Sequence, residues 1–172
     1  MREFVPDDPR VRYVRGECRG PAADFQAALD LARGEVVTPL SDDDRLPPHA
    51  LQTVHERIGG AAWLNGRTVL VTDGEPVAFR GGTRAHVEDT REGSYMLGGA
   101  VYWRKELTDE IGGFNSDFDG AADFDLYRRF LKHSDPVRVL DTLYIYTDHP
   151  GTDTRVNAAR QADASRRIAE AA

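Results

Sequence analysis

An apolar segment passes directly into an acidic one in the stretch Glu35-Val36-Val37-Thr38-Pro39-Leu40-Ser41-Asp42-Asp43-Asp44-Arg45-Leu46-Pro47-Pro48. Three adjacent carboxylates repel one another, so a folded protein relieves them with a cation or with strong hydrogen-bond donors. A divalent ion such as Mg²⁺ or Mn²⁺ takes oxygen ligands of this kind and often serves a phosphate-bearing ligand as well. The alternative interpretation is a solvated acidic turn before a helix that begins near Pro47.

The residues before the acidic triplet predict a strand, a helix and a second strand. Residues 11–15 alternate apolar and polar side chains as a strand does, and residues 22–33 have helical spacing before Gly34. With a strand over 36–40, this order implies parallel pairing and a right-handed crossover. Ligands of open parallel sheets bind outside the carboxyl ends of the strands, where the triplet would lie.

The rest of the chain predicts further helices and strands. Helices are expected over 49–58, 104–111, 123–133 and 157–171, and a hairpin is expected around Asp73-Gly74. Residues 94–103, 137–140 and 143–146 predict strands, and the polar stretch 81–93 predicts a loop. We therefore expect one domain over residues 1–156 and a C-terminal helical tail over 157–172.

Composition restricts the class of protein. The chain has 172 residues, enough for a single core, and its net charge of −7 argues against nucleic acid as a partner. Cys18 is the only cysteine, so the chain cannot form an internal disulfide, and a cytoplasmic setting is favoured. No stretch approaches the ~20 apolar residues that span a bilayer. A soluble protein that does not cross a membrane is expected.

Several motifs follow the acidic triplet in order. They are Gly98-Gly99-Ala100-Val101-Tyr102-Trp103-Arg104, then Ile111-Gly112-Gly113-Phe114-Asn115, then Ala122-Asp123-Phe124-Asp125, and finally Tyr146-Thr147-Asp148-His149-Pro150-Gly151. Over residues 8–154 the chain resembles the family 2 glycosyltransferases of the GT-A fold. The resemblance implies a GT-A-like, Rossmann-like α/β fold with a mostly parallel sheet flanked by helices. It also implies metal-dependent, inverting transfer of a sugar from a nucleotide-diphospho-sugar to an acceptor hydroxyl.

The resemblance gives the acidic residues specific roles. Asp43, with Asp42 and a ring nitrogen of His149, would bind Mg²⁺ or Mn²⁺ as a DxD-like motif. Asp42 would also lie near the sugar or ribose of the donor, and Asp44 would support its neighbours or cap the following turn. Asp123 would take the proton from the attacking hydroxyl as a general base. Its ordinary alternative, compatible with that role, is a helix N-cap.

Gly98, Gly99 and Arg104 complete the candidate binding residues. The two glycines lack a Cβ, so they would let a donor sugar approach the backbone, or they would only ease a bend in a strand. Arg104 would pair with a phosphate or a carboxylate, or would be a solvated arginine at the start of a helix.

Three features depart from the family pattern. Ala122 stands where a Glu commonly precedes the catalytic Asp, and Ser41 stands where many members carry a further Asp. Only 41 residues precede Asp42, so the first strand, helix and strand of the usual fold are expected to be absent. The sheet edge left uncovered then predicts a homo-oligomer or a partner chain that supplies strands.

Two other functions compete with sugar transfer. One is a non-catalytic GT-A-like domain that binds a sugar or a partner chain, which the shortened front and Ala122 favour. The other is a metal-dependent phosphohydrolase that uses the acidic triplet. Neither a nucleophile nor a phosphate-binding loop accompanies the triplet in the sequence, which disfavours a phosphohydrolase.

Overall fold

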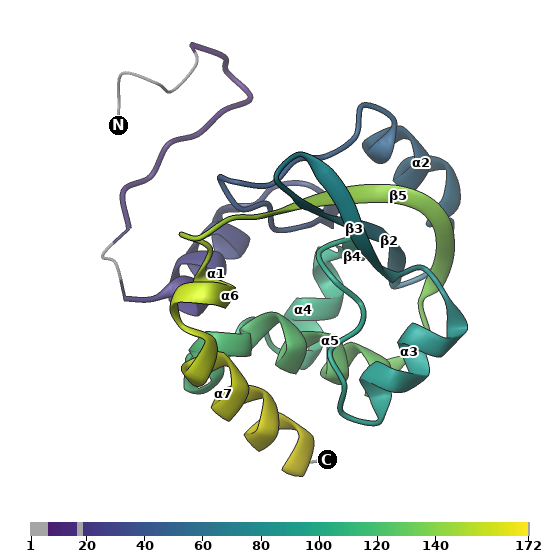
Figure 1. Cartoon of the computed structure of the whole chain (residues 1–172). Coiled ribbons are helices and arrows are strands. Elements are labelled where there is room, and N and C mark those ends of the chain that lie inside the picture. Colours follow the sequence, from purple (N-terminus) through teal and green to yellow (C-terminus); the bar gives the residue numbers. More distant parts are fainter. Residues whose placement is uncertain (1–6, 17–18, 172) are drawn as a thin grey trace.

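A computed structural model describes residues 7–16 and 19–171, and Cys18 lies outside these ranges. In the described part, a five-stranded sheet crosses the molecule and has helices on both faces (Figure 1). The expected α/β fold is confirmed, but the sheet is not mostly parallel, since one of its four described strand pairs is parallel and three are antiparallel. The element order is α1 (Pro21–Leu31), β1 (Val36–Val37), α2 (Ala50–Arg57), β2 (Trp63–Thr72), β3 (Glu75–Gly81), α3 (Arg84–Arg91), β4 (Val101–Arg104), α4 (Lys105–Ile111), the 3₁₀ helix η2 (Ser116–Ala121), α5 (Ala122–His133), β5 (Val137–Asp148), α6 (Asp153–Val156) and α7 (Ala158–Glu170).

The ten-residue strand β2 is the centre of the sheet. Along one edge it pairs parallel with β5. Along the other edge it pairs antiparallel with β4 through residues 63–65 and with β3 through residues 67–72. The short strand β1 extends the sheet beyond β4, again antiparallel. Within the described residues, β1 has no strand on its outer side.

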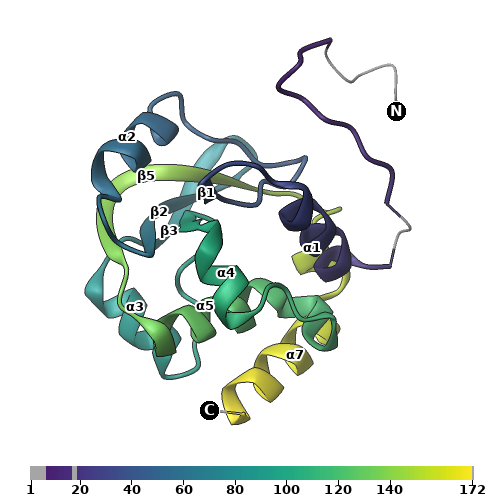
Figure 2. The same cartoon turned by 180° about the vertical axis from the view of Figure 1, so that it is seen from behind.

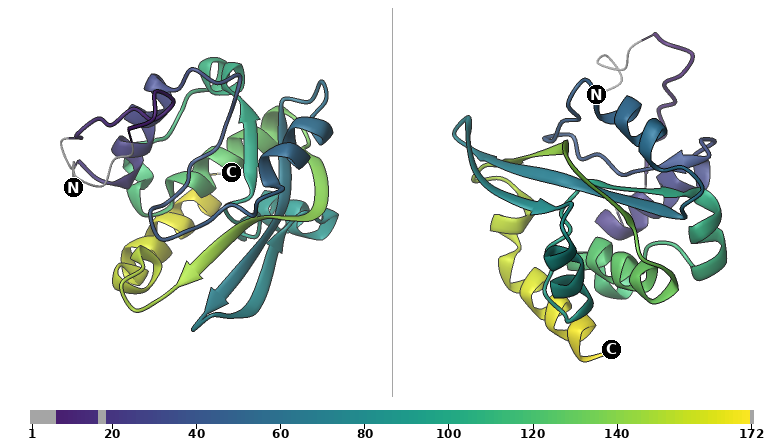
Figure 3. Two further views of the ribbon diagram at one scale, coloured as in Figure 1. Left: turned by 90° about the horizontal axis from the view of Figure 1, so that it is seen from above. Right: turned by 90° about the vertical axis from the view of Figure 1, so that its right-hand side faces the viewer.

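Side chains alternate between the two faces of the sheet and build two cores. On one face, Trp63 and Trp103 pack with α1, α3, α4 and α5. On the other face, Leu64 and Tyr102 pack with α2. The right-hand view of Figure 3 shows the layers, with α2 (blue) on one side of the sheet and α3, α5 and α7 (teal, green and yellow) on the other.

Many helices and turns lie where the local sequence predicts them. Helices α1, α2, α4, α5 and α7 confirm the expected helices to within a few residues. The predicted hairpin is also found, because Asp73 and Gly74 adopt the positive φ angles of 53° and 85° that its tight turn requires. Among the described residues, no helix has both the length and the apolar character that a membrane crossing demands.

The predicted parallel strand–helix–strand unit is wrong. Residues 11–16 form no strand, and the side chains of Val11 and Val14 are exposed, so their alternation covers no sheet. Figure 2 shows this part of the chain running outside the body of the molecule, near α1. The strand expected over 36–40 is only Val36–Val37, and it pairs antiparallel with β4. Pro39, two residues after the end of β1, has no N–H group to continue the ladder.

The region between β3 and β4 also differs from expectation. Residues 81–93 are not a loop, since α3 forms there and the hydroxyl oxygen of Thr83 accepts a hydrogen bond from His86 N–H at 3.1 Å. The strand expected over 94–103 is only Val101–Arg104, because Gly98 has a φ of 68° and breaks the extended chain before it. The two strands expected over 137–140 and 143–146 are one continuous strand, β5.

Candidate functional site

One cavity of about 590 Å³ gathers most of the residues singled out in the sequence. The loop after β1 contributes Asp42, Asp43 and Asp44 to its wall. The loop before β4 contributes Gly98 and Gly99, and the first turn of α5 contributes Asp123; residues of α6 and α7 also line it. The acidic triplet and Asp123, which are some 80 residues apart in the chain, therefore face a common space.

Asp44 is the carboxylate of the triplet whose oxygens both accept hydrogen bonds from other parts of the protein. It accepts a hydrogen bond from the Tyr144 hydroxyl at 2.7 Å and another from Thr147 N–H at 2.8 Å. Burial is the main cause that raises the pKa of Asp44, and the charges of Asp43 and Asp42 raise it further. Both donors lie on β5, so Asp44 fastens the acidic loop to the sheet at the cavity wall.

This role predicts a stability effect confined to Asp44. Asp44→Ala leaves the Tyr144 hydroxyl and Thr147 N–H without their acceptor, and should lower the free energy of unfolding by about 1–3 kcal/mol. Asp44→Asn keeps a side chain that can bond both groups and should stay close to wild type. Urea denaturation measures the difference, with Asp42→Ala as a control because Asp42 is exposed. Equal losses for Asp44→Ala and Asp42→Ala would contradict the assignment.

Asp43 is paired with His149. His149 Nε2 lies 3.2 Å from Asp43 Oδ2, and both side chains are partly open to solvent, with exposed fractions of 44% and 32%. Gly151 N–H donates to His149 Nδ1 at 3.1 Å, which places the proton of a neutral ring on Nε2. A metal ion at Nε2 would replace that proton, and the ring would have to give up the Gly151 bond.

Among the described residues, no three His, Cys, Asp or Glu side chains are arranged as a metal site. Asp43 and His149 still fit an ion that a substrate helps to bind. Mg²⁺ is commonly held by one or two carboxylates, water and substrate phosphates rather than by a complete set of protein ligands.

Asp123 lies in the first turn of α5, where a negative charge is favourable. It is not the N-cap, since that position is Ala121. The Tyr95 hydroxyl donates to Asp123 Oδ2 at 2.6 Å, and Phe124 N–H donates to Oδ1 at 2.8 Å. Burial raises the pKa of Asp123, while these two bonds and the charge of Arg80 act in the opposite direction. A carboxylate of this kind can accept a proton.

Residues 1–116 match the sequence model of the family described as Glycosyl transferase family 2. The chain belongs to this family. Two curated relatives are similar to it. The glycosyltransferase YwdF of Bacillus subtilis, described as uncharacterized, is 28% identical over 86% of this chain and 59% of its own length. The uncharacterized protein y4gI of Sinorhizobium fredii is 28% identical over 93% of this chain and 18% of its own length.

Solved structures of TarS from S. aureus share the fold. The complex of TarS 1-349 with UDP-GlcNAc has a TM-score of 0.64 at 18% identity, over 87% of this chain and 46% of that chain. The complex with UDP has a TM-score of 0.55 at 19% identity, over 87% and 49%. The present chain thus spans less than two thirds of the length of each of these curated relatives and TarS structures.

The glycine pair of this family 2 domain has a packing role. Gly98 has a positive φ, and a Cβ built on it would lie 2.7 Å from Thr68 Oγ1. A Cβ on Gly99 would lie 2.7 Å from the ring of Tyr144, the residue that holds Asp44. Both glycines line the cavity, but contacts inside the protein are enough to explain why neither position carries a side chain.

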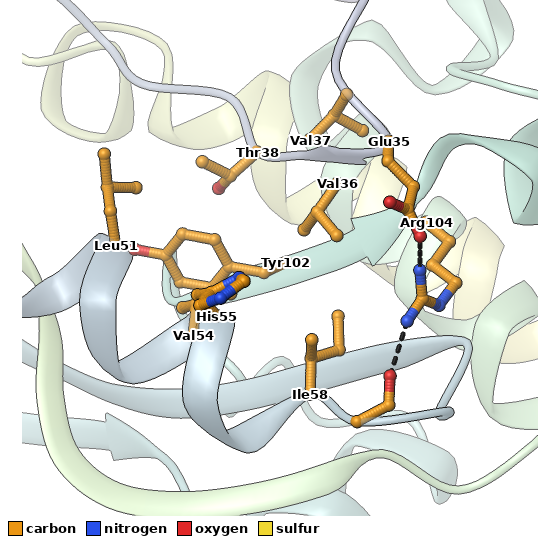
Figure 4. Close-up of a pocket in the computed structure, with 11 residues that line it drawn as sticks. Glu35, Val36, Val37, Thr38, Leu51, Val54, His55, Ile58, Tyr102 and Arg104 are labelled. Carbon is orange, nitrogen blue, oxygen red and sulfur yellow. Dashed lines mark hydrogen bonds and ion pairs between the residues drawn. The ribbon is translucent and has the colours of Figure 1, made fainter.

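The structure does not bring Arg104 to the cavity. Its guanidinium pairs with Glu35 and donates to the carbonyl oxygens of Gly59 and Ala61. These groups border a separate pocket of about 340 Å³ between β1 and α2 (Figure 4). Arg104 therefore ties the sheet edge to the end of α2, away from the acidic triplet.

Arg80 and Tyr95 are among the residues of the cavity wall that sequence reasoning misses. Tyr95 is the hydrogen-bond donor to Asp123, and the Arg80 guanidinium lies 6.0 Å from the centre of the Tyr95 ring. Tyr95 falls in a segment predicted to be a strand, and Arg80 falls in a hairpin. Neither residue stands in a motif, so no local signal identifies them.

Proposed function

We propose that this family 2 domain transfers a sugar from a nucleotide-diphospho-sugar to a hydroxyl of an acceptor, with inversion and with the help of Mg²⁺ or Mn²⁺. One observation carries the proposal: Asp43 and Asp123 line the same cavity. Its volume of about 590 Å³ is within the usual range of small-molecule sites. The family membership and the UDP-GlcNAc complex of TarS support a nucleotide-linked sugar as the donor.

The charge of the cavity supports a metal requirement. The described residues of its wall include seven aspartates and a single basic residue, Arg80; the aspartates are Asp42, Asp43, Asp44, Asp119, Asp123, Asp148 and Asp153. Asp119, Asp148 and Asp153 are paired with arginines outside the wall. The other four aspartates would repel a diphosphate unless a cation comes with it. Asp43, with His149, would hold the ion. When bound, a divalent ion neutralises the charge that develops on the departing nucleoside diphosphate.

The protein's own residues would then act on the acceptor. Asp123 receives the proton of the attacking hydroxyl, and Tyr95 fixes one oxygen of that carboxylate. The hydroxyl displaces the nucleoside diphosphate in one in-line step, which inverts the configuration at the sugar carbon. Among the described residues of the wall, no Cys and no Ser–His pair offers a covalent nucleophile.

A non-catalytic domain is the remaining alternative. Ala122, at the place of the usual Glu, is buried in the larger core, so the acceptor side lacks that carboxylate. Such a domain would bind a sugar or a partner without turnover. The retained pair of Asp43 and His149 favours the enzyme, because this pair has no structural task as clear as that of Asp44.

The experiment is a calorimetric titration with nucleoside diphosphates and UDP-GlcNAc, with and without Mn²⁺. We expect at least one nucleotide to bind in the presence of Mn²⁺ and not in its absence. A subsequent assay for nucleoside diphosphate release, with sugar acceptors present, tests for turnover. If none of the nucleotides binds, the non-catalytic domain is favoured. Release of inorganic phosphate without an acceptor would identify a phosphohydrolase.

A further inference from the structure

Arg80 occupies the part of the cavity wall next to the proposed base. It lies near the end of β3, and its guanidinium faces the Tyr95 ring at 6.0 Å from the centroid. The Tyr95 hydroxyl in turn binds Asp123 at 2.6 Å. Arg80, Tyr95 and Asp123 all line the cavity. A positive charge thus stands beside the carboxylate that is to receive the proton.

Among the described residues, the Arg80 guanidinium has no carboxylate at ion-pair distance, although its charge acts on the nearby Asp123. In the described part of the chain it makes neither a hydrogen bond nor an ion pair, and its one contact of note is the Tyr95 ring. Arg104, Arg129 and Arg160, by contrast, each hold a carboxylate. A guanidinium offers five N–H donors in a planar fork that matches a carboxylate or a phosphate. Arg80 lines the cavity, so these donors are available to a ligand there.

The position of Arg80 indicates which of the two substrates would carry an anionic group that it binds. Arg80 lies against Tyr95, which binds Asp123, whereas Asp43 contacts His149. The acceptor hydroxyl must come within hydrogen-bond reach of the base. An anion at Arg80 would therefore lie beside the acceptor hydroxyl at Asp123, while the donor diphosphate would lie at Asp43.

We propose that Arg80 binds an anionic group of the acceptor, a phosphate or a carboxylate close to the hydroxyl that reacts. This proposal rests on the function proposed above. It names the acceptor as a sugar that carries a phosphate or a carboxylate rather than a neutral one. In a wall of seven aspartates, Arg80 would be the feature that admits such a molecule.

The test measures binding of three probes without metal or nucleotide: glucose, glucose 6-phosphate and glucuronate. Chemical-shift perturbation gives the affinities. We expect the two anionic sugars to bind about tenfold more tightly than glucose, since a hydrogen bond to a charged group is stronger than a neutral one. Arg80→Gln should remove that preference. Arg80→Lys, which keeps the charge but not the planar fork, should retain part of that preference. This second variant keeps the test informative if Arg80→Gln does not fold.

Arg84→Gln is the matched control, because Arg84 is an exposed arginine of α3 outside the cavity wall. It should behave as wild type. The proposal is overturned if glucose binds as well as the anionic sugars, or if Arg80→Gln and Arg84→Gln behave alike. Loss of Mn²⁺-dependent nucleotide binding in Arg80→Gln would also overturn it, by assigning the guanidinium to the donor.

Asp43→Ala separates this proposal from the function on which it rests. The variant should lose nucleotide binding and keep the Arg80-dependent preference for anionic sugars. If wild type binds no nucleotide and yet prefers the anionic sugars through Arg80, sugar transfer fails and an anionic sugar site remains.

Discussion

Replacing Asp123 with asparagine should lower the rate of sugar transfer by about 10²–10⁴-fold, the usual contribution of a general base. The amide has nearly the same shape but does not take a proton at neutral pH. Its oxygen can accept from Phe124 N–H while its NH₂ group donates to the Tyr95 hydroxyl, so both local bonds survive. Metal-dependent nucleotide binding should be unchanged, because Asp43 is untouched. Release of nucleoside diphosphate measures the rate.

The same variant should gain stability at neutral pH. The pKa of Asp123 is raised above the ordinary value of 3.8, chiefly by burial, so its ionisation is less favourable in the folded protein than in the unfolded chain. Ionisation therefore lowers the stability of wild type as the pH rises from 3.8 through the folded-state pKa. Asp123→Asn should melt at a higher temperature than wild type at pH 7, and the difference should vanish below pH 3.8. Full activity in this variant would show that Asp123 is not the base.

Replacing Asp43 with alanine should abolish Mn²⁺-dependent nucleotide binding and lower transfer by about 100-fold or more. A bound ion contributes several kcal/mol of charge stabilisation in the transition state, and each 1.4 kcal/mol is about a factor of ten. Little stability should be lost, because the one hydrogen-bond partner of the Asp43 side chain in the described part of the chain is His149. Calorimetry with Mn²⁺ and UDP measures the binding.

Asp109→Ala is the control for that experiment, since Asp109 is an exposed aspartate of α4 that does not line the cavity. It removes the same charge at a distance from the site. Should Asp43→Ala and Asp109→Ala bind the nucleotide equally well, the ion would have to be held elsewhere, and the assignment of Asp43 would be wrong.

Local chemistry explains which parts of the fold the sequence predicts. Helix α1 ends shortly before Gly34, and the hairpin turns at Asp73-Gly74, because each depends on a few consecutive residues. Helix α3 could not be predicted from its polar composition. Its place depends on the capping Thr83 and on burial of Val87 and Thr90 against the rest of the domain. The partner of β1 depends on the pairing of residues 68 positions apart, Val36 and Arg104.

The candidate site could likewise be predicted only in part, because its non-local contacts cannot be deduced from the sequence. The sequence places Asp42, Asp43 and Asp44 in one motif but does not say which of them faces inward. Asp44 is distinguished by Tyr144, which is 100 residues away in the chain. Asp123 is distinguished by Tyr95, 28 residues away. Such pairs form only when the sheet and the helices have assembled. The motif therefore identifies the carboxylates, but their roles depend on contacts made in the folded protein.

Helix α7 has a consequence for any shortened version of this protein. Its Ala164 and Ile168 pack against Phe124, the residue next to the proposed base, and Arg128 of α5 donates to the carbonyl oxygen of Ile168. Gln161 and Ser165 belong to the cavity wall itself. Cutting the chain at residue 156 would uncover the flank of α5 and open the acceptor side to solvent, so expression trials should retain the last sixteen residues.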